Sequence, residues 1–217
     1  MYDNEAWVKY PNHHKWFNKL YVAELMGYNC GPAGVPPPKT GWYVIRPIYN
    51  LSGMGIFARI EYIYAHTQNI AKIPPGYFWC EAFSGTHSSA TYEWQTNKEN
   101  LRGEWKPISC WIGTRDHQED RLYKFSEWKR SDYIPELPSQ LHGLSGIRRI
   151  NVEFINDNVI EVHLRESTDP EYDIIIPIWQ SDVTDHKWYT DRGFKYIEDY
   201  DNADGMLPNP RLGFMVK

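Results

Sequence analysis

The sequence lacks several features that would place it in a well-marked class of proteins. Its 217 residues contain only three cysteines, Cys30, Cys80 and Cys110. An odd number of widely separated thiols argues against a disulfide framework and favours a reducing, cytoplasmic location. No apolar run approaches the roughly 20 residues that a membrane span needs, and the N-terminus has no signal-peptide pattern. We therefore expect a cytoplasmic protein with no membrane contact.

Positive charge and common site motifs are also scarce. The chain has 23 Lys and Arg against 28 Asp and Glu, a net charge of −5. This balance argues against a surface that coats nucleic acid, but a few local cations could still hold a nucleotide. There is no Walker A motif, no dinucleotide fingerprint and no nucleophile elbow, so those three kinds of site are excluded.

Aromatic residues, in contrast, are abundant, with 10 Trp and 16 Tyr. Most aromatic side chains fill cores, but exposed rings can also form a platform for sugars. A carbohydrate-binding β module is therefore one alternative for this chain. Its length fits one large domain or two small ones.

The order of the expected elements predicts an α+β fold class. Asn12 could cap a helix over 13–26 that ends at Gly27, and 126–144 is weakly patterned and partly helical. Strands are expected at 42–48, 56–64, 77–83, 90–94, 108–112 and 171–179, and no regular element is expected after 181. Since helices and strands do not alternate as βαβ units, the sheets should be mostly antiparallel.

The segment NVEFINDNVIEVHLR, residues 151–165, has the clearest pattern. Its alternation predicts two strands joined by the three-residue loop 156–158, with Asn158 in the left-handed conformation. Successive side chains point to opposite faces of a strand, so one face is apolar and the other polar. The apolar pairs are Phe154 with Ile160, Val152 with Val162 and Ile150 with Leu164; the polar pairs are Glu153 with Glu161, Asn151 with His163 and Arg149 with Arg165.

Two carboxylates facing each other across a strand pair weaken that pair. Glu153 and Glu161 are tolerable together if a divalent cation sits between them, if one is protonated, or if an arginine bridges them. On spacing alone, a solvated sheet face with an arginine bridge is as good an interpretation as a metal site.

Four more segments precede the hairpin in a recognisable order. A lysine-bearing helix with Lys15 is followed by Gly27 and a proline run. Then come the strand end Val44-Ile45-Arg46-Pro47, the turn Ser52-Gly53-Met54-Gly55, and the segment CEAFSGTH that holds Glu81 and His87. With the hairpin, this series resembles the ATP-grasp fold over about residues 12 to 165. Departures from the family pattern are Arg46 in place of lysine, His87 in place of glutamate and His163 in place of asparagine.

The resemblance implies a role for each matching residue. Lys15, Arg46 and the turn residues Ser52, Gly53 and Gly55 would contact the ATP phosphates, Glu81 and His87 the adenosine, Glu153, Glu161 and His163 the metal, and Arg165 the acyl-phosphate. The implied cofactors are ATP and Mg²⁺, with Mn²⁺ as an alternative ion because histidine is a softer ligand than the usual oxygen donor.

The resemblance also implies the architecture and the activity. An N-terminal lobe, 1–78, would carry the glycine-rich turn, a C-terminal lobe, 79–217, would carry the hairpin, and the nucleotide would lie between them. The implied enzyme is an ATP-dependent carboxylate–amine or carboxylate–thiol ligase that acts through an acylphosphate on small-molecule or peptide substrates. A catalytically silent nucleotide-binding or structural protein is the alternative. The family's usual N-terminal domain is not matched, so a partner chain or a homo-oligomer would complete the acceptor site.

Overall fold

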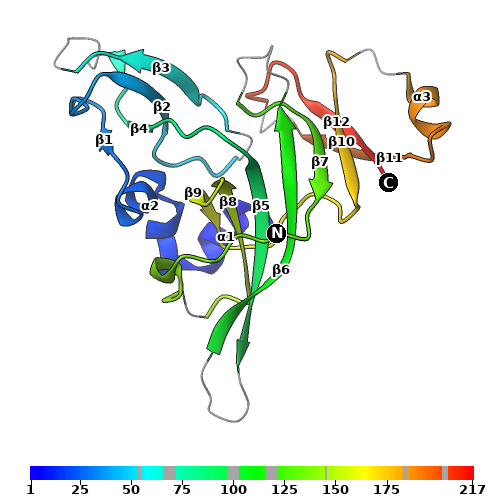
Figure 1. Cartoon of the computed structure of the whole chain (residues 1–217), viewed down its shortest axis with the longest axis horizontal. Coiled ribbons are helices and arrows are strands. Elements are labelled where there is room, and N and C mark those ends of the chain that lie inside the picture. Colours follow the sequence, from blue (N-terminus) through cyan, green and yellow to red (C-terminus); the bar gives the residue numbers. More distant parts are fainter. Residues whose placement is uncertain are drawn as a thin grey trace.

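The computed structural model describes residues 1–52, 55–65, 72–96, 103–115, 122–144, 146–182, 185–201 and 205–217. These residues form two antiparallel sheets with short helices (Figure 1), so the predicted α+β class with mostly antiparallel sheets is confirmed. Among the described residues, no helix is both long and apolar enough to cross a membrane.

The smaller sheet has four strands in the order β1-β4-β2-β3. Their bounds are β1 Cys30–Pro32, β2 Gly41–Pro47, β3 Arg59–Ile63 and β4 Tyr77–Glu81. Its apolar face buries Tyr43, Ile45, Ile63 and Trp79 in one cluster. The predicted strand 42–48 matches β2 closely, whereas the strand expected at 56–64 begins only at Arg59, after a turn.

The larger sheet has eight strands in the order β11-β12-β10-β7-β6-β5-β8-β9. Their bounds are β5 His87–Thr96, β6 Gly103–Arg115, β7 Phe125–Arg130, β8 Arg149–Ile155, β9 Asn158–His163, β10 Ile174–Trp179, β11 Lys195–Asp201 and β12 Arg211–Val216. The long strands β5 and β6 run through the middle of the molecule (Figure 1). The segment 126–144 begins with most of β7 and holds one short 3₁₀ turn, Ser139–Leu141, as its helical part. Beyond residue 181, where no element was expected, the described residues form α3, His186–Thr190, and the strands β11 and β12.

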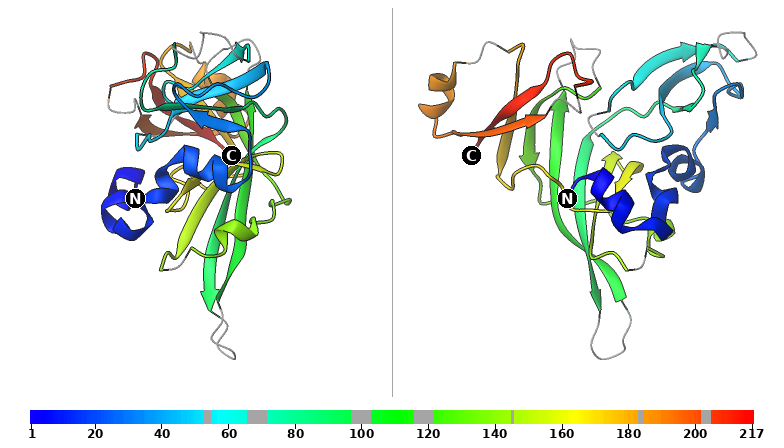
Figure 2. Two further views of the ribbon diagram at one scale, coloured as in Figure 1. Left: turned by 90° about the vertical axis from the view of Figure 1, so that its left-hand side faces the viewer. Right: turned by 180° about the vertical axis from the view of Figure 1, so that it is seen from behind.

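The N-terminal helices pack against the hairpin β8–β9 (Figure 2). They are α1 Asp3–Lys9, the 3₁₀ helix η1 Pro11–Phe17 and α2 Lys19–Leu25. The single helix predicted over 13–26 with an Asn12 cap is wrong. Instead, the Asn18 side chain accepts a hydrogen bond from the Tyr21 N–H and caps α2, which breaks the segment in two. Trp16 and Val22 join Phe154 and Val162 in the main core.

The hairpin register agrees with the prediction between its two ends: it differs at the tip, and the predicted pairs Ile150–Leu164 and Arg149–Arg165 lie beyond the end of β9 at His163. Glu153 lies opposite Glu161, and Asn151 lies opposite His163. Beyond them the register shifts, so that Phe154 faces Val159, Ile155 faces Asn158, and Ile160 is a bulge. The loop therefore has two residues instead of three, and the left-handed residue is Asn156, with φ of 52°, not Asn158. The bulge restores the alternation that a two-residue loop would otherwise disturb.

The predicted division at residues 78 and 79 falls inside β4. Residues of α1, η1 and α2, which belong to the predicted N-terminal lobe, share their core with the larger sheet. The two lobes thus correspond to two sheets, and the chain passes from one to the other after β4. The domain boundaries themselves stay a prediction.

Gly213 of β12 is required for close strand packing. A Cβ atom at this position would lie 2.2 Å from the Ile197 carbonyl oxygen of β11, a backbone atom that cannot move without disturbing the ladder. Gly213→Ala should therefore destabilise the fold by about 1–3 kcal/mol, measured by urea unfolding. Gly143→Ala is the control, because nothing lies within 4 Å of its Cβ position. Equal stability of the two variants would contradict this account of the β11–β12 pair.

Candidate functional site

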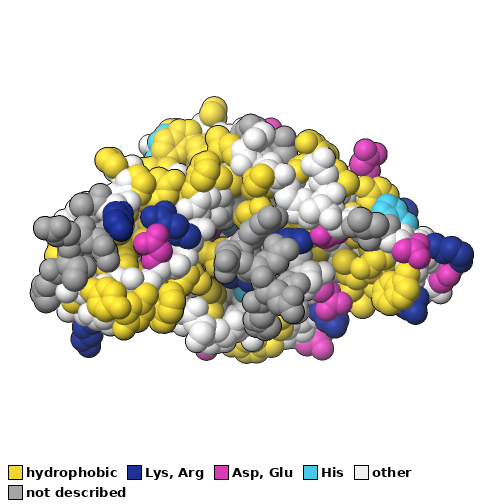
Figure 3. Space-filling model, turned by 90° about the horizontal axis from the view of Figure 1, so that it is seen from above, with side chains coloured by type: hydrophobic (Ala, Val, Ile, Leu, Met, Phe, Trp, Pro, Cys, Tyr) yellow, Lys and Arg dark blue, Asp and Glu magenta, His cyan; other side chains and the backbone are white. Residues whose placement is uncertain are grey.

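A cavity of about 250 Å³ lies between the two sheets. Strands β2 and β4 of the smaller sheet and β8 and β9 of the hairpin contribute to its walls; from them come Val44, Arg46, Cys80, Glu81, Asn151, Glu153, Glu161 and His163. The space-filling view shows charged side chains near the centre of this face, with hydrophobic side chains on either side (Figure 3). The cavity therefore combines apolar walls with a charged floor.

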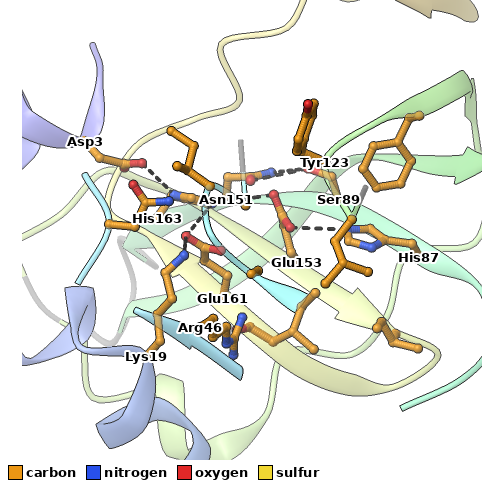
Figure 4. A pocket seen from close by; sticks show the side chains of 18 of the residues that line it. Asp3, Lys19, Arg46, His87, Ser89, Tyr123, Asn151, Glu153, Glu161 and His163 are labelled. Carbon is orange, nitrogen blue, oxygen red and sulfur yellow. Dashed lines mark hydrogen bonds and ion pairs between the residues drawn. The ribbon is translucent and has the colours of Figure 1, made fainter. Parts of the chain in front are cut away.

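The two hairpin carboxylates lie on one side of the hairpin and face the cavity (Figure 4). Glu161 pairs with Lys19, whose Nζ lies 2.6 Å from Oε1. Glu153 accepts a hydrogen bond from His87 Nε2 at 3.2 Å. His163 Nε2 lies 3.6 Å from Glu153 and 3.8 Å from Glu161, between the two acids. Basic groups from other elements, rather than an arginine bridge on the hairpin itself, thus balance the facing carboxylates.

Asp3 of α1 holds the other side of His163. Its carboxylate accepts from His163 Nδ1 at 2.9 Å and from both Nε and Nη2 of Arg165 at 2.9 Å. Burial alone would raise the pKa of the Asp3 carboxyl, but His163 and Arg165 outweigh burial and hold this pKa well below its usual range. Arg165 therefore lines the cavity but already forms an ion pair with Asp3.

The charge state of His163 follows from the same contacts. Burial alone lowers the pKa of this imidazole, but Asp3 and Glu161 raise it more, to about 9. An imidazolium has no lone pair for a metal ion. As placed here, His163 serves as a cation between acids, and the geometry does not support its predicted role as a metal ligand. For Glu153, burial acts to raise the pKa, but hydrogen bonds from His163 and His87 prevail and keep it well below the usual value.

Lys19, not Lys15, is the helix lysine at this cavity. Lys15 is absent from the described residues that line it, and its Nζ lies 5.4 Å from the ring centres of Trp16 and Tyr21. Lys19 begins α2, is buried, and reaches Glu161. The phosphate contact of Lys15 stays a prediction, and Lys19 is the helix lysine that lines the cavity. Recognising Asn18 as a helix cap would have pointed to Lys19, the residue directly after it.

Arg46 lies where the resemblance places it, at the cavity wall on β2. Its Nη2 donates to the carbonyl oxygen of Ile160 at 2.8 Å, and its guanidinium lies 5.3 Å from the centre of the Phe78 ring. Ile160 is the bulged residue, whose carbonyl the irregular register leaves for this contact. The buried Arg46 Nε has no hydrogen-bond partner among the described residues.

The remaining predicted residues are divided between the two ends of the cavity. Ser52 and Gly55 line it, whereas Gly53 lies outside the described residues. Glu81 lines it at the end of β4 and accepts from the backbone N–H and the side-chain amide of Asn29. His87 contacts Glu153, so it belongs to the carboxylate group of the site.

Asp3, Lys19 and Arg115 are the site residues that sequence patterns missed. Arg115 Nη2 donates to His87 Nδ1 at 3.0 Å. Because arginine can only donate, this contact assigns the ring hydrogen of His87 to Nε2, which donates to Glu153. No local motif marks Asp3 or Arg115, since each reaches the site from a distant part of the chain, and for Lys19 the only local signal is the Asn18 cap before it.

The donor set fits a metal only in company with a ligand. Among the described residues, no group of three or more His, Cys, Asp and Glu side chains is arranged to hold an ion. Mg²⁺, however, commonly takes one or two protein carboxylates and completes its shell with water and phosphate oxygens. Glu153 and Glu161 supply two hard oxygen donors and therefore fit a nucleotide-bound magnesium.

Comparison with known proteins identifies the fold. No protein-family model and no curated protein matches the sequence. N5-carboxyaminoimidazole synthetase from Staphylococcus aureus, solved with ADP, superposes with a TM-score of 0.52 at 10% identity, over 95% of this chain and 68% of that chain. An ATP-grasp superfamily protein from Archaeoglobus fulgidus gives 0.49 at 12% identity, over 94% and 65%. The ATP-grasp ligase PsnB, solved with a minimal precursor, Mg and ADP, gives 0.42 at 14%, over 73% and 53%.

The two sheets and the charged cavity between them define a two-lobed α+β protein. Its arrangement is the ATP-grasp fold, as the resemblance predicted. At such low identity the likeness establishes the fold alone. The chain spans about two thirds of the length of the first two of these structures, 65% and 68%, so parts of them have no counterpart here.

The His163–Asp3 ion pair predicts a pH-dependent stability. Because the pKa of folded His163 is raised from 6.5 to about 9, its contribution is complete below pH 6.5 and is lost as the pH rises through about 9. His163→Gln should therefore cost up to about 3 kcal/mol at the lower pH, and much less above pH 9. Urea unfolding at several pH values, without divalent metal, measures this difference.

His186→Gln is the control for this measurement, because it removes an exposed histidine of α3 that does not contact the hairpin. A stability difference between wild type and His163→Gln that stays constant across the range would show that the histidine acts without its charge.

Proposed function

We propose that this chain binds Mg-ATP in the cavity, phosphorylates a carboxylate, and passes the acyl group to an amine or a thiol. The observation that carries the proposal is the pair Glu153 and Glu161, which face the cavity of an ATP-grasp fold with Arg46 on the opposite lobe. Two acids and separate cations match a ligand that carries both a divalent ion and phosphates.

The chain's own residues would hold the nucleotide from both lobes. Arg46 offers a planar fork that never loses its charge, and its Nε still lacks a partner among the described residues. Ser52 and Gly55 bring the turn to the same cavity; the Ser52 N–H donates to Asn50 Oδ1 at 3.1 Å and would exchange this partner for a phosphate oxygen. Bound Mg²⁺, held by Glu153 and Glu161, would neutralise charge on the phosphates.

Lys19 is placed to exchange partners when the ligand binds. In the structure its ammonium pairs with Glu161 at 2.6 Å, and both side chains are largely buried. If Glu161 held a divalent ion, Lys19 would lose this partner, and its flexible stem would let the ammonium turn to an anionic phosphate oxygen. The exchange keeps every buried charge paired before and after binding.

The proposed reaction has two steps. A substrate carboxylate oxygen attacks the γ-phosphorus, the bond to the bridging oxygen breaks, and its electron pair leaves with ADP. An amine or thiol then attacks the acyl carbon, phosphate leaves, and the nucleophile's proton passes to solvent. Arg165, predicted to stabilise the acyl-phosphate, has both arms of its fork on Asp3. We therefore propose that it positions α1 against the hairpin rather than touching the reacting groups.

The substrates are proposed as a small-molecule or peptide carboxylate and an amine, with a partner chain or a second copy of this chain completing the acceptor site. The second candidate is a nucleotide-binding or structural protein without turnover. The Lys19–Glu161 ion pair favours it, because one proposed metal ligand is already neutralised. ADP release from Mg-ATP with a panel of carboxylates and amines separates the two: binding without release selects the silent protein.

Arg46→Gln should weaken binding of the non-hydrolysable analogue Mg-AMP-PNP about tenfold or more, because a charge-assisted hydrogen bond to phosphate is lost. Isothermal titration calorimetry measures the affinity. Lys15→Gln is the matched control, since it removes a cation that lies outside the described lining of the cavity. A larger loss in Lys15→Gln than in Arg46→Gln would restore the original assignment of Lys15 and refute the present one.

Glu161→Gln should lower ADP release about 100-fold, because the shape is kept while a charge that binds metal is removed. Circular dichroism checks that the variant is folded, which matters because Lys19 loses its counter-ion. Glu93→Gln is the control: Glu93 pairs with Arg148 and Arg149 and does not line the cavity among the described residues. Unchanged turnover in Glu161→Gln would end the metal assignment.

A further inference from the structure

Most of the cationic side chains at the cavity are already balanced by an acid. Lys19 pairs with Glu161, Arg165 with Asp3, and Arg211 lies 3.1 Å from Asp199, 3.4 Å from Asp169 and 3.7 Å from Asp201. Because acids already compensate their charge, these cations attract an anionic ligand only weakly.

Arg46 and Arg115 also line the cavity, but they differ from these three cations. In the described part of the chain neither forms an ion pair, and the Nε of each is buried without a hydrogen-bond partner. Arg115 donates from Nη2 to the neutral acceptor His87 Nδ1 and stacks on Phe125, 4.8 Å from the ring centre. Glu153 attracts the Arg115 guanidinium but forms no ion pair with it among the described residues, so an anionic ligand in direct contact would compensate its burial more fully.

The two arginines approach the hairpin from different lobes. Arg46 comes from β2 and bonds the Ile160 carbonyl of β9. Arg115 comes from the end of β6 and reaches Glu153 of β8 through His87. Arg46 thus contacts the hairpin directly at β9, whereas Arg115 is linked to β8 only through His87. A single triphosphate held at Arg46 leaves Arg115 for a second anion.

We propose that Arg115 binds the carboxylate of the acyl-donor substrate, and that this substrate carries an apolar group next to its carboxylate. The proposal rests on the proposed function for its place in the reaction, but carboxylate binding at Arg115 can be measured without turnover. It moves the substrate-binding cation from Arg165, which Asp3 occupies, to a residue on another strand.

Aromatic side chains surround Arg115, and they are the reason to expect an apolar group on the substrate. Phe125 and Trp128 are in contact with their rings tilted by 38° and their ring centres 4.3 Å apart, and both also pack edge-on against His87. Gly113 lets these rings cross the strand, because a Cβ there would lie 2.7 Å from Phe125 and 2.8 Å from Trp128. Tyr123 and Trp179 line the cavity beside them. Aromatic faces next to a guanidinium suit a hydrocarbon group attached to a carboxylate.

The test uses the whole chain and 3-phenylpropionate as the probe, with 3-phenylpropionamide as its uncharged counterpart. Binding is followed by NMR through the Arg115 Nε–H signal, assigned by its loss in Arg115→Gln, and by Trp fluorescence. The affinity of Mg-AMP-PNP is measured separately by calorimetry. Arg130→Gln is the matched control, because Arg130 lies on the neighbouring strand β7, over Trp111, and outside the described cavity lining.

We expect saturable binding of the acid, little binding of the amide, and a loss of about tenfold or more in Arg115→Gln, as for a hydrogen-bonded charge pair. Arg130→Gln should behave as wild type in acid binding and in Mg-AMP-PNP affinity. Equal binding of acid and amide, or full acid binding by Arg115→Gln, overturns the proposal. A loss of acid binding in Arg115→Gln that is matched by an equal loss of Mg-AMP-PNP affinity assigns the effect to the His87–Glu153 contact and also overturns it.

The outcomes keep this proposal distinct from the proposed function. Acid binding that depends on Arg115, without any nucleotide binding, supports the carboxylate site and removes the ATP-dependent reaction. Nucleotide binding with no binding of the acid in wild type leaves the ATP site standing and refutes the role of Arg115.

Discussion

The like-charge pair of Glu153 and Glu161 is the constraint on which the site depends. Facing carboxylates repel each other, and their partial burial removes the water that would screen them. Three basic side chains lie next to these carboxylates and compensate their repulsion: Lys19 from α2, His87 from β5 and His163 from the hairpin itself. The contacts of Lys19 and His87 join distant parts of the chain to β8–β9, so neutralising the pair also assembles the cavity.

The N-terminal helix α1 belongs to this arrangement. Asp3 is 4% exposed and accepts hydrogen bonds from both His163 and Arg165. Without it, two cations would lie close together beneath the hairpin, since Arg165 Nη2 and His163 Nδ1 are 3.4 Å apart. Breaking a buried pair by removing one partner is far more costly than losing a surface ion pair. The helix is thus held by charge as well as by the apolar contacts of Ala6.

The pattern of ion pairs also explains which cationic residues of the cavity are available to bind ligands. Lys19, Arg165 and Arg211 form ion pairs with acids, whereas Arg46 and Arg115 hydrogen-bond only to neutral groups among the described residues, and Glu153 attracts Arg115 without forming an ion pair. The cavity therefore has two cationic side chains that no acid contacts directly. This pattern suits two anionic groups that must meet beside a divalent ion, and it underlies both proposals.

Local periodicity determined a substantial part of this protein from sequence alone. Alternation of apolar and polar residues predicted both hairpin strands and the pairing of Glu153 with Glu161, because a strand's faces are set by its period of two. The order of the motifs predicted the ATP-grasp fold. Only the tertiary structure decided the long-range features: the bulge at Ile160, the position of Lys19 rather than Lys15 at the cavity, and the positions of Asp3 and Arg115 in the site. Periodicity says which face a side chain takes, but the partner of a buried charge depends on which distant elements pack against it, and that is settled only when the sheets and helices come together.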